Sequence, residues 1–227
     1  MSRRPLDSSV PAIAVHDVSK RYGRTIALDH VDLEVAAGEF VVLTGPSGAG
    51  KSTLLNLLAA LEKPDTGTIF VRGHRLGRRS RHLNHLRRVE VGLVFQLHNL
   101  IPRLTARENV EAAMFGTHRG RRQRTARADE LLERLDLAER ATDRPPTMSG
   151  GERQRAAIAR AVANQPAVLL ADEPSGSLDD HSAQLVFDLF DEMRDGGATI
   201  LAVSHDSRLE QRGSRVISIA DLSTSAA

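Results

Sequence analysis

Residues 45–52 read GPSGAGKS and follow the apolar run 40–43. This spacing of glycine, lysine and serine is the GxxxxGK[ST] pattern, whose glycines let successive backbone N–H groups wrap around phosphate oxygens. The helix expected after the loop adds the positive end of its dipole. The pattern therefore predicts a loop that binds the phosphates of a nucleoside triphosphate, in preference to an ordinary glycine-rich turn.

Two side chains of this phosphate loop have predicted chemical roles. Lys51 would neutralise the β- and γ-phosphates, and the hydroxyl of Ser52 would be a ligand of Mg²⁺. The residues predicted to contact the nucleotide here are Gly45, Pro46, Ser47, Gly48, Ala49, Gly50, Lys51, Ser52 and Thr53.

A second segment, residues 167–174, reads AVLLADEP and is typical of a buried strand that ends in two carboxylates. At the carboxyl end of a strand, Asp172 can hold Mg²⁺ through water, and Glu173 can act as the general base that polarises the attacking water. A merely solvated strand end does not account for two adjacent acids in a chain with a phosphate loop. We therefore predict that Asp172 is a metal ligand and Glu173 a catalytic residue.

A third segment, residues 148–152, reads MSGGE and precedes a helical pattern. Ser149 can cap that helix, while Gly150 and Gly151 leave its first backbone N–H groups accessible to an anion. Taken alone, the segment is equally an ordinary N-cap turn. Its position before the AVLLADEP segment is what gives it meaning.

The composition limits the classes of function. The 227 residues include 31 Lys and Arg against 29 Asp and Glu, so the net charge is only +2. Arginine clusters at 72–88 and 119–127 lack interleaved aromatic residues, which are 3% of the chain, so we interpret them as solvated faces and expect no nucleic-acid partner. The absence of cysteine excludes disulfides, a thiolate nucleophile and cysteine-based zinc sites, and suits a reducing compartment.

Neither a signal peptide nor a membrane span is predicted. The N-terminal segment has arginines but no apolar core, and no later run approaches the ~20 apolar residues that cross a bilayer. We therefore expect a cytoplasmic protein.

Short apolar runs alternate with amphipathic patterns along the chain, which predicts a mostly parallel α/β sheet. The expected strands are 13–15, 31–35, 68–71, 91–95, 168–171 and 200–203, and the expected helices are 52–61, 125–137, 149–164 and 182–194. Residues 97–163 lack strand patterning, so we expect them to form an inserted helical subdomain.

The order of these segments resembles that of ATP-binding cassette (ABC) proteins, from about residue 13 to residue 220. Residues 148–152 match the family's LSGGQ signature, Gln96 matches its Q-loop, and His205 its switch histidine. Ser177, Leu178 and Asp179 match the D-loop, and Tyr22 the aromatic residue that stacks on adenine. Taken alone, each has a simpler interpretation. Gln96 could be a hydrogen-bonding residue at a strand end, His205 is one of nine histidines, and Tyr22 could be a half-buried surface aromatic. Their joint order decides for the family.

The resemblance implies the P-loop NTPase fold of ABC ATPases. It implies an ATP-binding core of residues 12–96 and 164–222 with an antiparallel β-subdomain, a helical signature subdomain of residues 97–163, and a tail of residues 223–227. The whole cassette, residues 11–222, is one domain. The resemblance also implies ATP and Mg²⁺ as ligands, with Ser52, Gln96 and Asp172 around the metal and Lys51, Glu173 and His205 in catalysis.

In this family two cassettes pair head to tail. The resemblance therefore implies a homodimer in which Ser149, Gly150 and Gly151 contact the partner's nucleotide, with Asp179 at the same boundary. It further implies a separate membrane permease that holds the ATPase at the inner face of the membrane. Four positions depart from the family pattern, and Ser177 in place of Asn removes an amide from the subunit boundary; the others are Met148 for Leu, Glu152 for Gln and Ser175 for Thr.

Three stretches are similar to the lipoprotein-release and macrolide-export branch of the family: residues 54–67, 94–110 and 171–179. A cell-division ABC ATPase that transmits motion through its membrane partner, and an amino-acid importer ATPase, stay open as alternatives. A soluble ABC ATPase of DNA repair or translation fits worst, because such proteins usually carry two cassettes or a long coiled coil. The apolar residues Leu100, Ile101, Pro102 and Leu104 are a candidate permease groove, or else pack within the helical subdomain.

Overall fold

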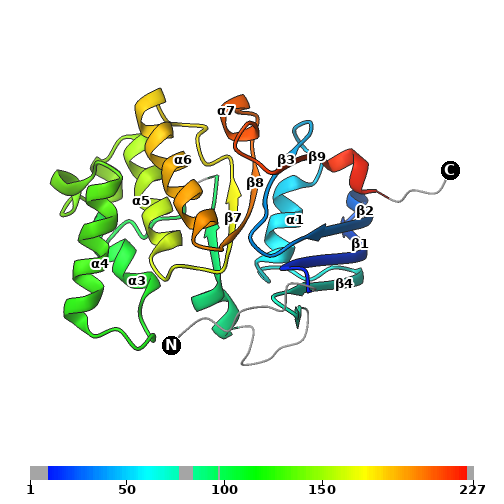
Figure 1. Ribbon diagram of the computed structural model, residues 1–227, viewed down its shortest axis with the longest axis horizontal. Helices are drawn as coiled ribbons and strands as arrows, with labels where there is room; N and C mark the ends of the chain where they lie inside the picture. The colour runs from blue at the N-terminus through cyan, green and yellow to red at the C-terminus, as the bar shows by residue number, and fades with distance from the viewer. Residues whose placement is uncertain (1–9, 77–83, 97, 224–227) are drawn as a thin grey trace.

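The apolar runs of the sequence form two sheets, which Figure 1 shows beside each other in the computed structural model. The structure describes residues 10–76, 84–96 and 98–223. The five-stranded sheet is parallel throughout and has the order β6-β7-β8-β3-β9. Its strands are β3 (Phe40–Thr44), β6 (Val91–Val94), β7 (Val168–Asp172), β8 (Thr199–Val203) and β9 (Arg215–Ser218).

The second sheet is antiparallel, with the order β2-β1-β4-β5. Its strands are β1 (Ile13–Tyr22), β2 (Thr25–Val35), β4 (Thr66–Val71) and β5 (His74–Arg75). Together the two sheets and their helices confirm the predicted α/β class, with a parallel core sheet and an antiparallel sheet beside it.

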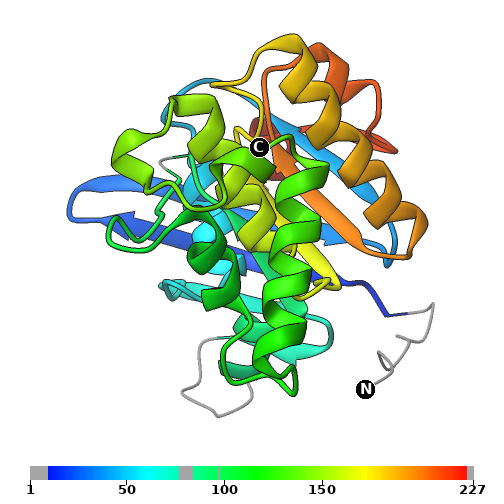
Figure 2. The same cartoon turned by 90° about the vertical axis from the view of Figure 1, so that its left-hand side faces the viewer.

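Helices cover both faces of the parallel sheet. The regular helices are α1 (Lys51–Leu58), α3 (Ala106–Ala113), α4 (Arg121–Arg134), α5 (Gly150–Val162), α6 (Asp180–Asp195) and α7 (Ser207–Glu210). Short irregular turns join them: a π-helix η1 (Leu86–Glu90) and 3-10 helices η2 (Ala138–Arg140), η3 (Pro145–Thr147) and η4 (Ile219–Leu222). Figure 2 views the molecule from the side of α3 and α4, which lie in front of the strands.

The core divides along the parallel sheet because strand side chains alternate between its faces. Phe40 and Val42 of β3 point into a cluster with α3, α4, α5 and α6, while Val41 and Leu43 point into a cluster with α1 and the antiparallel sheet. Apolar residues on both sides explain why the parallel strands read as continuous apolar runs.

Several elements extend beyond, or lie outside, the predicted ranges. Strands β1 and β2 are much longer than the predicted runs 13–15 and 31–35, because left-handed residues at Asp17 and His30 and the shifts in pairing register interrupt their apolar pattern. Strand β6 ends at Val94 rather than 95, and α4 runs from Arg121 to Arg134 instead of 125–137. Helices α3 and α7 and strands β5 and β9 were not predicted.

The helical segment predicted between β6 and β7 consists of α3, α4 and α5. Residues 77–83 of the predicted basic segment 72–88, and residues 224–227 of the predicted tail, lie outside the described residues. The parallel sheet brings the carboxyl ends of β3, β7 and β8 to the same edge, where ligands bind in open α/β sheets.

Candidate nucleotide site

The phosphate loop leaves β3 and enters α1 at Lys51. Gly50 has a φ of 90°, and a Cβ atom there would lie 2.1 Å from the carbonyl oxygen of Ala27. At Gly45, with a φ of 137°, a Cβ atom would lie 2.7 Å from the Ile219 side chain. Both positions therefore need glycine, for backbone conformation and for close approach.

Lys51 folds back over this loop. Its residue is 8% exposed, and its Nζ donates hydrogen bonds to the carbonyl oxygens of Gly45 (2.5 Å) and Pro46 (2.8 Å). Gly50, the N-cap of α1, provides no side-chain cap, so the first N–H groups of the helix have no side chain competing with an anion. The local geometry suits the binding of phosphate oxygens.

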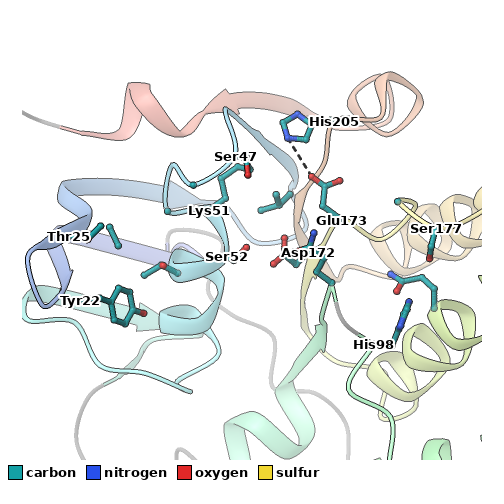
Figure 3. Close-up of a pocket in the computed structure, with 18 of the residues that line it drawn as sticks. Tyr22, Thr25, Ser47, Lys51, Ser52, His98, Asp172, Glu173, Ser177 and His205 are labelled. Carbon is teal, nitrogen blue, oxygen red and sulfur yellow. Dashed lines mark ion pairs between the residues drawn. The ribbon is translucent and has the colours of Figure 1, made fainter. Parts of the chain in front are cut away.

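A cavity of about 700 Å³ opens beside the loop (Figure 3). It collects most of the residues predicted to act on the nucleotide. The predicted residues that line it are Tyr22, Ser47, Gly48, Gly50, Lys51, Ser52, Thr53, Gln96, Asp172, Glu173 and His205. Residues from β1, the phosphate loop, the ends of β7 and β8, and the segment after β6 thus meet at one site.

The side chains of Glu173 and His205 lie next to each other at this cavity, and Figure 3 marks the pair with a dashed line. The Nε2 atom of His205 lies 3.6 Å from Oε1 of Glu173, whose side chain is 22% exposed. Burial raises the pKa of Glu173 above its usual value, the neighbouring charge of Asp172 adds to this, and His205 opposes it. A carboxyl with a raised pKa beside a phosphate loop is a suitable proton acceptor.

Glu173 has an unusual backbone for its residue type. Its φ is 47°, in the left-handed region, and its N–H donates to the carbonyl oxygen of Val203 (2.9 Å). The following turn closes with a bond from the N–H of Gly176 to the carbonyl oxygen of Glu173 (3.2 Å). We call residues 173–176 the Glu173 turn; such local strain is common at functional sites.

The side chains of Ser52, Asp172 and Gln96, the three predicted metal ligands, are among the oxygen-bearing groups that line the cavity. Among the residues that the structure describes, no group of three or more His, Cys, Asp or Glu side chains could hold a metal ion alone. A hydroxyl, one carboxylate and an amide match the hard oxygen ligands of a Mg²⁺ ion that takes its remaining ligands from phosphate and water.

Tyr22 lines the opposite end of the cavity and is 46% exposed. Its hydroxyl donates to Glu62, and the ammonium of Lys20 lies 5.4 Å from its ring centroid. Thr25 and Ile26, from the start of β2, line the cavity beside it. The ring is therefore held in place while much of its surface stays accessible for stacking.

The signature segment lies apart from this cavity. Ser149 caps α5: its Oγ accepts from the N–H of Glu152 (3.2 Å), and Glu152 accepts from the N–H of Ser149 (2.7 Å). That second bond lowers the pKa of Glu152. Ser149, Gly150 and Gly151 do not line the cavity, and a Cβ at Gly151 would lie 3.2 Å from the carbonyl oxygen of Ser177.

Asp179 is also separate from the cavity. Its carboxylate caps α6, accepting from the N–H (2.8 Å) and the hydroxyl (3.0 Å) of Ser182, and the N–H bond lowers its pKa. Gly45, Pro46 and Ala49 of the phosphate loop do not line the cavity with their surfaces either.

Sequence reasoning missed Gln154 and His98, which also line the cavity. Gln154 is 1% exposed on α5, and its Nε2 donates to the carbonyl oxygen of Pro174 (3.2 Å). Its burial is visible only in the structure, so the sequence carried no signal for it. Thr25 and Ile26 had none either, because only the long β1–β2 hairpin brings them to the site.

A phosphate loop between β3 and α1, with two carboxylates at the end of β7, defines a P-loop nucleotide-binding protein. A family model described as ABC transporter matches residues 28–176. The lipoprotein-releasing system ATP-binding protein LolD of Bacteroides fragilis is 43% identical over 211 residues, which are 92% of this chain and 98% of that protein. The chain belongs to the ABC transporter family, as one of its ATPase subunits.

Other relatives agree with this assignment. The pyoverdine export ATP-binding/permease protein PvdT of Pseudomonas aeruginosa is 42% identical over 218 residues, 93% of this chain but 33% of that protein. A dimeric structure of the ATP-binding cassette MJ0796 in a post-hydrolysis state bound to ADP and Pi has a TM-score of 0.86 and 38% identity, and covers 91% of this chain and 93% of that one. The predicted family and ATPase class are confirmed. In the described part of the chain, no helix is long and apolar enough to cross a membrane.

Proposed function

We propose that this chain binds ATP with Mg²⁺ in the cavity, hydrolyses it with Glu173 as general base, and thereby drives a separate membrane permease of the lipoprotein-release or export type. The observation that carries the chemistry is the position of Glu173, 3.6 Å from His205 in the same cavity as Lys51. The names of the LolD and PvdT relatives support a permease of the lipoprotein-release or export type.

In this proposal the residues of the cavity divide the work. Glu173 accepts the proton of the attacking water, and its raised pKa makes it a stronger base than an ordinary glutamate. His205, next to it, orients the carboxylate and the terminal phosphate. Lys51 exchanges its hydrogen bonds to Gly45 and Pro46 for bonds to phosphate oxygens, while Tyr22 stacks on the adenine.

Ser52, Asp172 and Gln96 would hold Mg²⁺. The metal supplies charge neutralisation for the phosphates when it is bound. The three residues provide oxygen donors on separate elements, α1, β7 and the segment after β6, so the ion also depends on the phosphates for its coordination. We therefore expect Mg²⁺ to bind tightly only together with nucleotide.

The signature segment serves a second copy of the chain in this proposal. Ser149 is exposed, and none of the residues Ser149, Gly150 and Gly151 lines the cavity of its own chain. Among the described residues, the N–H groups of Gly150 and Gly151 donate to no group of the chain, as is usual for the first turn of a helix. They are available for the γ-phosphate bound by a partner, with Asp179 nearby. The dimeric MJ0796 cassettes support this arrangement.

A groove of about 430 Å³ is the proposed docking site for a cytoplasmic segment of the permease. Its apolar lining includes Leu61, Leu93 and Phe95, and its rim carries Arg87 and Arg88. Among the described residues these two arginines bond to the carbonyl oxygens of Ala60 and Gly116 and to the side-chain amide of Asn84, and no carboxylate pairs with them. The groove therefore suits a segment with apolar and acidic side chains, and the ATPase would sit at the inner membrane face through it.

The proposed groove does not include the apolar run 100–104 that the sequence offered as a candidate. Leu100 packs against the core cluster of the helical segment, and neither Leu100, Ile101, Pro102 nor Leu104 lines the groove. Their apolar run is continuous in sequence, whereas the groove is assembled from η1, β6, α5 and the end of α1.

The partner can be identified directly. We would express the tagged Glu173→Gln variant in the native host, solubilise membranes with ATP and Mg²⁺, and identify the integral membrane protein that co-purifies. A permease with few spans and a large extracytoplasmic domain supports the proposed branch. A many-span importer, or no membrane partner, contradicts the branch and leaves the ATPase assignment intact.

The groove is tested by two matched substitutions. Leu61 and Ile101 are 48% and 47% exposed, so an aspartate at either position costs little folding energy. We expect Leu61→Asp to abolish permease co-purification while ATP binding persists, and Ile101→Asp to keep the partner. The opposite pattern would move the docking site to residues 100–104, and loss of ATP binding in Leu61→Asp would indicate misfolding.

A further inference from the structure

Asp206 follows His205 directly and makes contacts that the proposed chemistry does not use. We propose that Asp206 is a positioning residue for ATP hydrolysis, which fixes the Glu173 turn against the turn that carries His205. The proposal rests on the proposed roles of Glu173 and His205. Asp206 itself does not line the nucleotide cavity, so it touches neither substrate nor reacting atoms.

The carboxylate of Asp206 has two well-defined sets of partners. One oxygen, Oδ1, accepts from the N–H and the Nε of Arg208, both at 3.0 Å. The other, Oδ2, accepts from the Oγ of Ser175 (3.0 Å) and from Nη2 of Arg208 (2.8 Å). The side chain of Asp206 is 16% exposed, and Ser175 is 8% exposed, so the bond between them is shielded from water.

Ser175 belongs to the Glu173 turn, two residues after the proposed base. Asp206 lies in the turn after β8, where its own N–H donates to Oγ of Ser204 (3.0 Å). The Ser175–Asp206 bond therefore joins the two turns that carry Glu173 and His205. The separation of 3.6 Å between those two side chains depends on how the turns sit relative to one another.

Arg208 connects these two turns to a third segment, the start of α6. The Nη1 atom of Arg208 lies 2.8 Å from Oδ1 of Asp180, which is the first residue of α6 and follows the D-loop residue Asp179. The guanidinium of Arg208 also lies 5.7 Å from the ring centroid of Phe187, which is fully buried. Arg208 thus gives Asp206 a fixed position relative to α6.

The Glu173 turn has reason to need such support. Glu173 holds a left-handed φ of 47°, which is strained for a residue with a side chain and persists only where surrounding contacts enforce it. Gln154 holds the turn from α5 through the carbonyl oxygen of Pro174, and Asp206 holds it from the opposite side through Ser175. Without Asp206 the turn can relax, which moves the base away from its working position.

The test is the kinetics of ATP hydrolysis by purified Asp206→Asn protein. Asparagine keeps the size of the side chain and removes the charge that holds Arg208 and Ser175. We expect kcat to fall roughly tenfold, while KM and the affinity for ATP stay within about twofold, because geometry at the reacting centre is lost and nucleotide contacts are not.

Substitutions at Ser175 test the same hydrogen bond independently, and one of them restores the lost hydroxyl. Ser175→Ala should lower kcat in the same way, and Ser175→Thr, which restores a hydroxyl, should recover most of the loss. The double variant with Asp206→Asn should lose less than the product of the single effects, because both substitutions break one bond. If Asp206→Asn does not fold, the Ser175 pair still decides the proposal.

The matched control is Asp188→Asn. Asp188 also joins α6 to the segment after α7, 3.5 Å from Nη1 of Arg212, but touches neither turn. It should leave kcat unchanged. A kcat for Asp206→Asn within twofold of wild type would overturn the proposal, as would an equal loss in both Asp variants. Failure of the Glu173 assignment would show separately, as activity of Glu173→Gln within tenfold of wild type.

Discussion

The Glu173→Gln substitution tests the general-base assignment most directly. Glutamine has the size of glutamate but cannot accept the proton of the attacking water, so the cavity keeps its shape and loses the base. A positioned general base contributes roughly 10²–10⁴-fold to a rate, which corresponds to about 3–5 kcal/mol of activation free energy. Because burial raises the pKa of Glu173 and so strengthens it as a base, we expect a loss of roughly 10³-fold in kcat.

Phosphate release at saturating ATP and Mg²⁺ measures this loss. Nucleotide binding should persist, since the substitution removes one negative charge from a cavity that also holds Asp172 and must accept an anionic ligand. Size-exclusion chromatography with ATP should then show a trapped dimer. The matched control is Glu192→Gln, whose 64% exposed side chain pairs with Arg134 on the surface. Activity of Glu173→Gln within tenfold of wild type would refute the assignment.

Further predictions concern the base, the aromatic residue and the loop. Because the pKa of Glu173 is raised, kcat should fall on acidification at a higher pH than an ordinary glutamate would give, while ATP binding at the same pH persists. Tyr22→Ala should weaken ATP binding roughly fivefold, the effect of about 1 kcal/mol of stacking, and Tyr22→Phe should keep most of the affinity in a fluorescent-nucleotide titration. Gly50→Ala should lower the free energy of unfolding by roughly 2–4 kcal/mol, through its backbone strain and its clash with Ala27. Gly48→Ala, where a Cβ meets nothing within 4 Å, should lower the free energy of unfolding by only about 1–2 kcal/mol. Urea titration of both variants measures the difference, and an equal cost at both glycines would contradict the clash.

The parts of the site that were predictable are those encoded in contiguous residues. The phosphate loop, the acids after β7 and the cap of α5 each depend on neighbours a few positions apart, and local spacing determines their geometry. The outer wall of the cavity was not predictable in the same way. Thr25 and Ile26 reach it only because β1 and β2 form a long hairpin, whose register shifts disrupt the alternation that a sequence pattern would show.

Assembly across distant segments explains the other misses. The run 100–104 is apolar and continuous, which suggested a groove, but Leu100 is used for core packing. The groove instead brings Leu61, after α1, against Leu93 and Phe95, in and just after β6. Asp206 caps the four-residue helix α7, which was not predicted. Its bond to Ser175, 31 positions earlier, requires β7 and β8 to lie side by side.

The proposed split of the site between two chains has a thermodynamic consequence. The first turn of α1 lines the cavity, whereas that of α5 does not, so the N–H groups at the start of α5 do not contribute to the cavity of their own chain. If each ATP is completed by a partner, nucleotide binding and dimerisation are coupled equilibria, and a nucleotide that bound only the dimer would add about 2.7 kcal/mol per site to dimer stability at 100 times its dissociation constant. Hydrolysis removes the γ-phosphate that bridges the two helices. In the proposed cycle the lifetime of the dimer would depend on hydrolysis by Glu173, and so on the geometry of the Glu173 turn, to which Asp206 is bonded through Ser175.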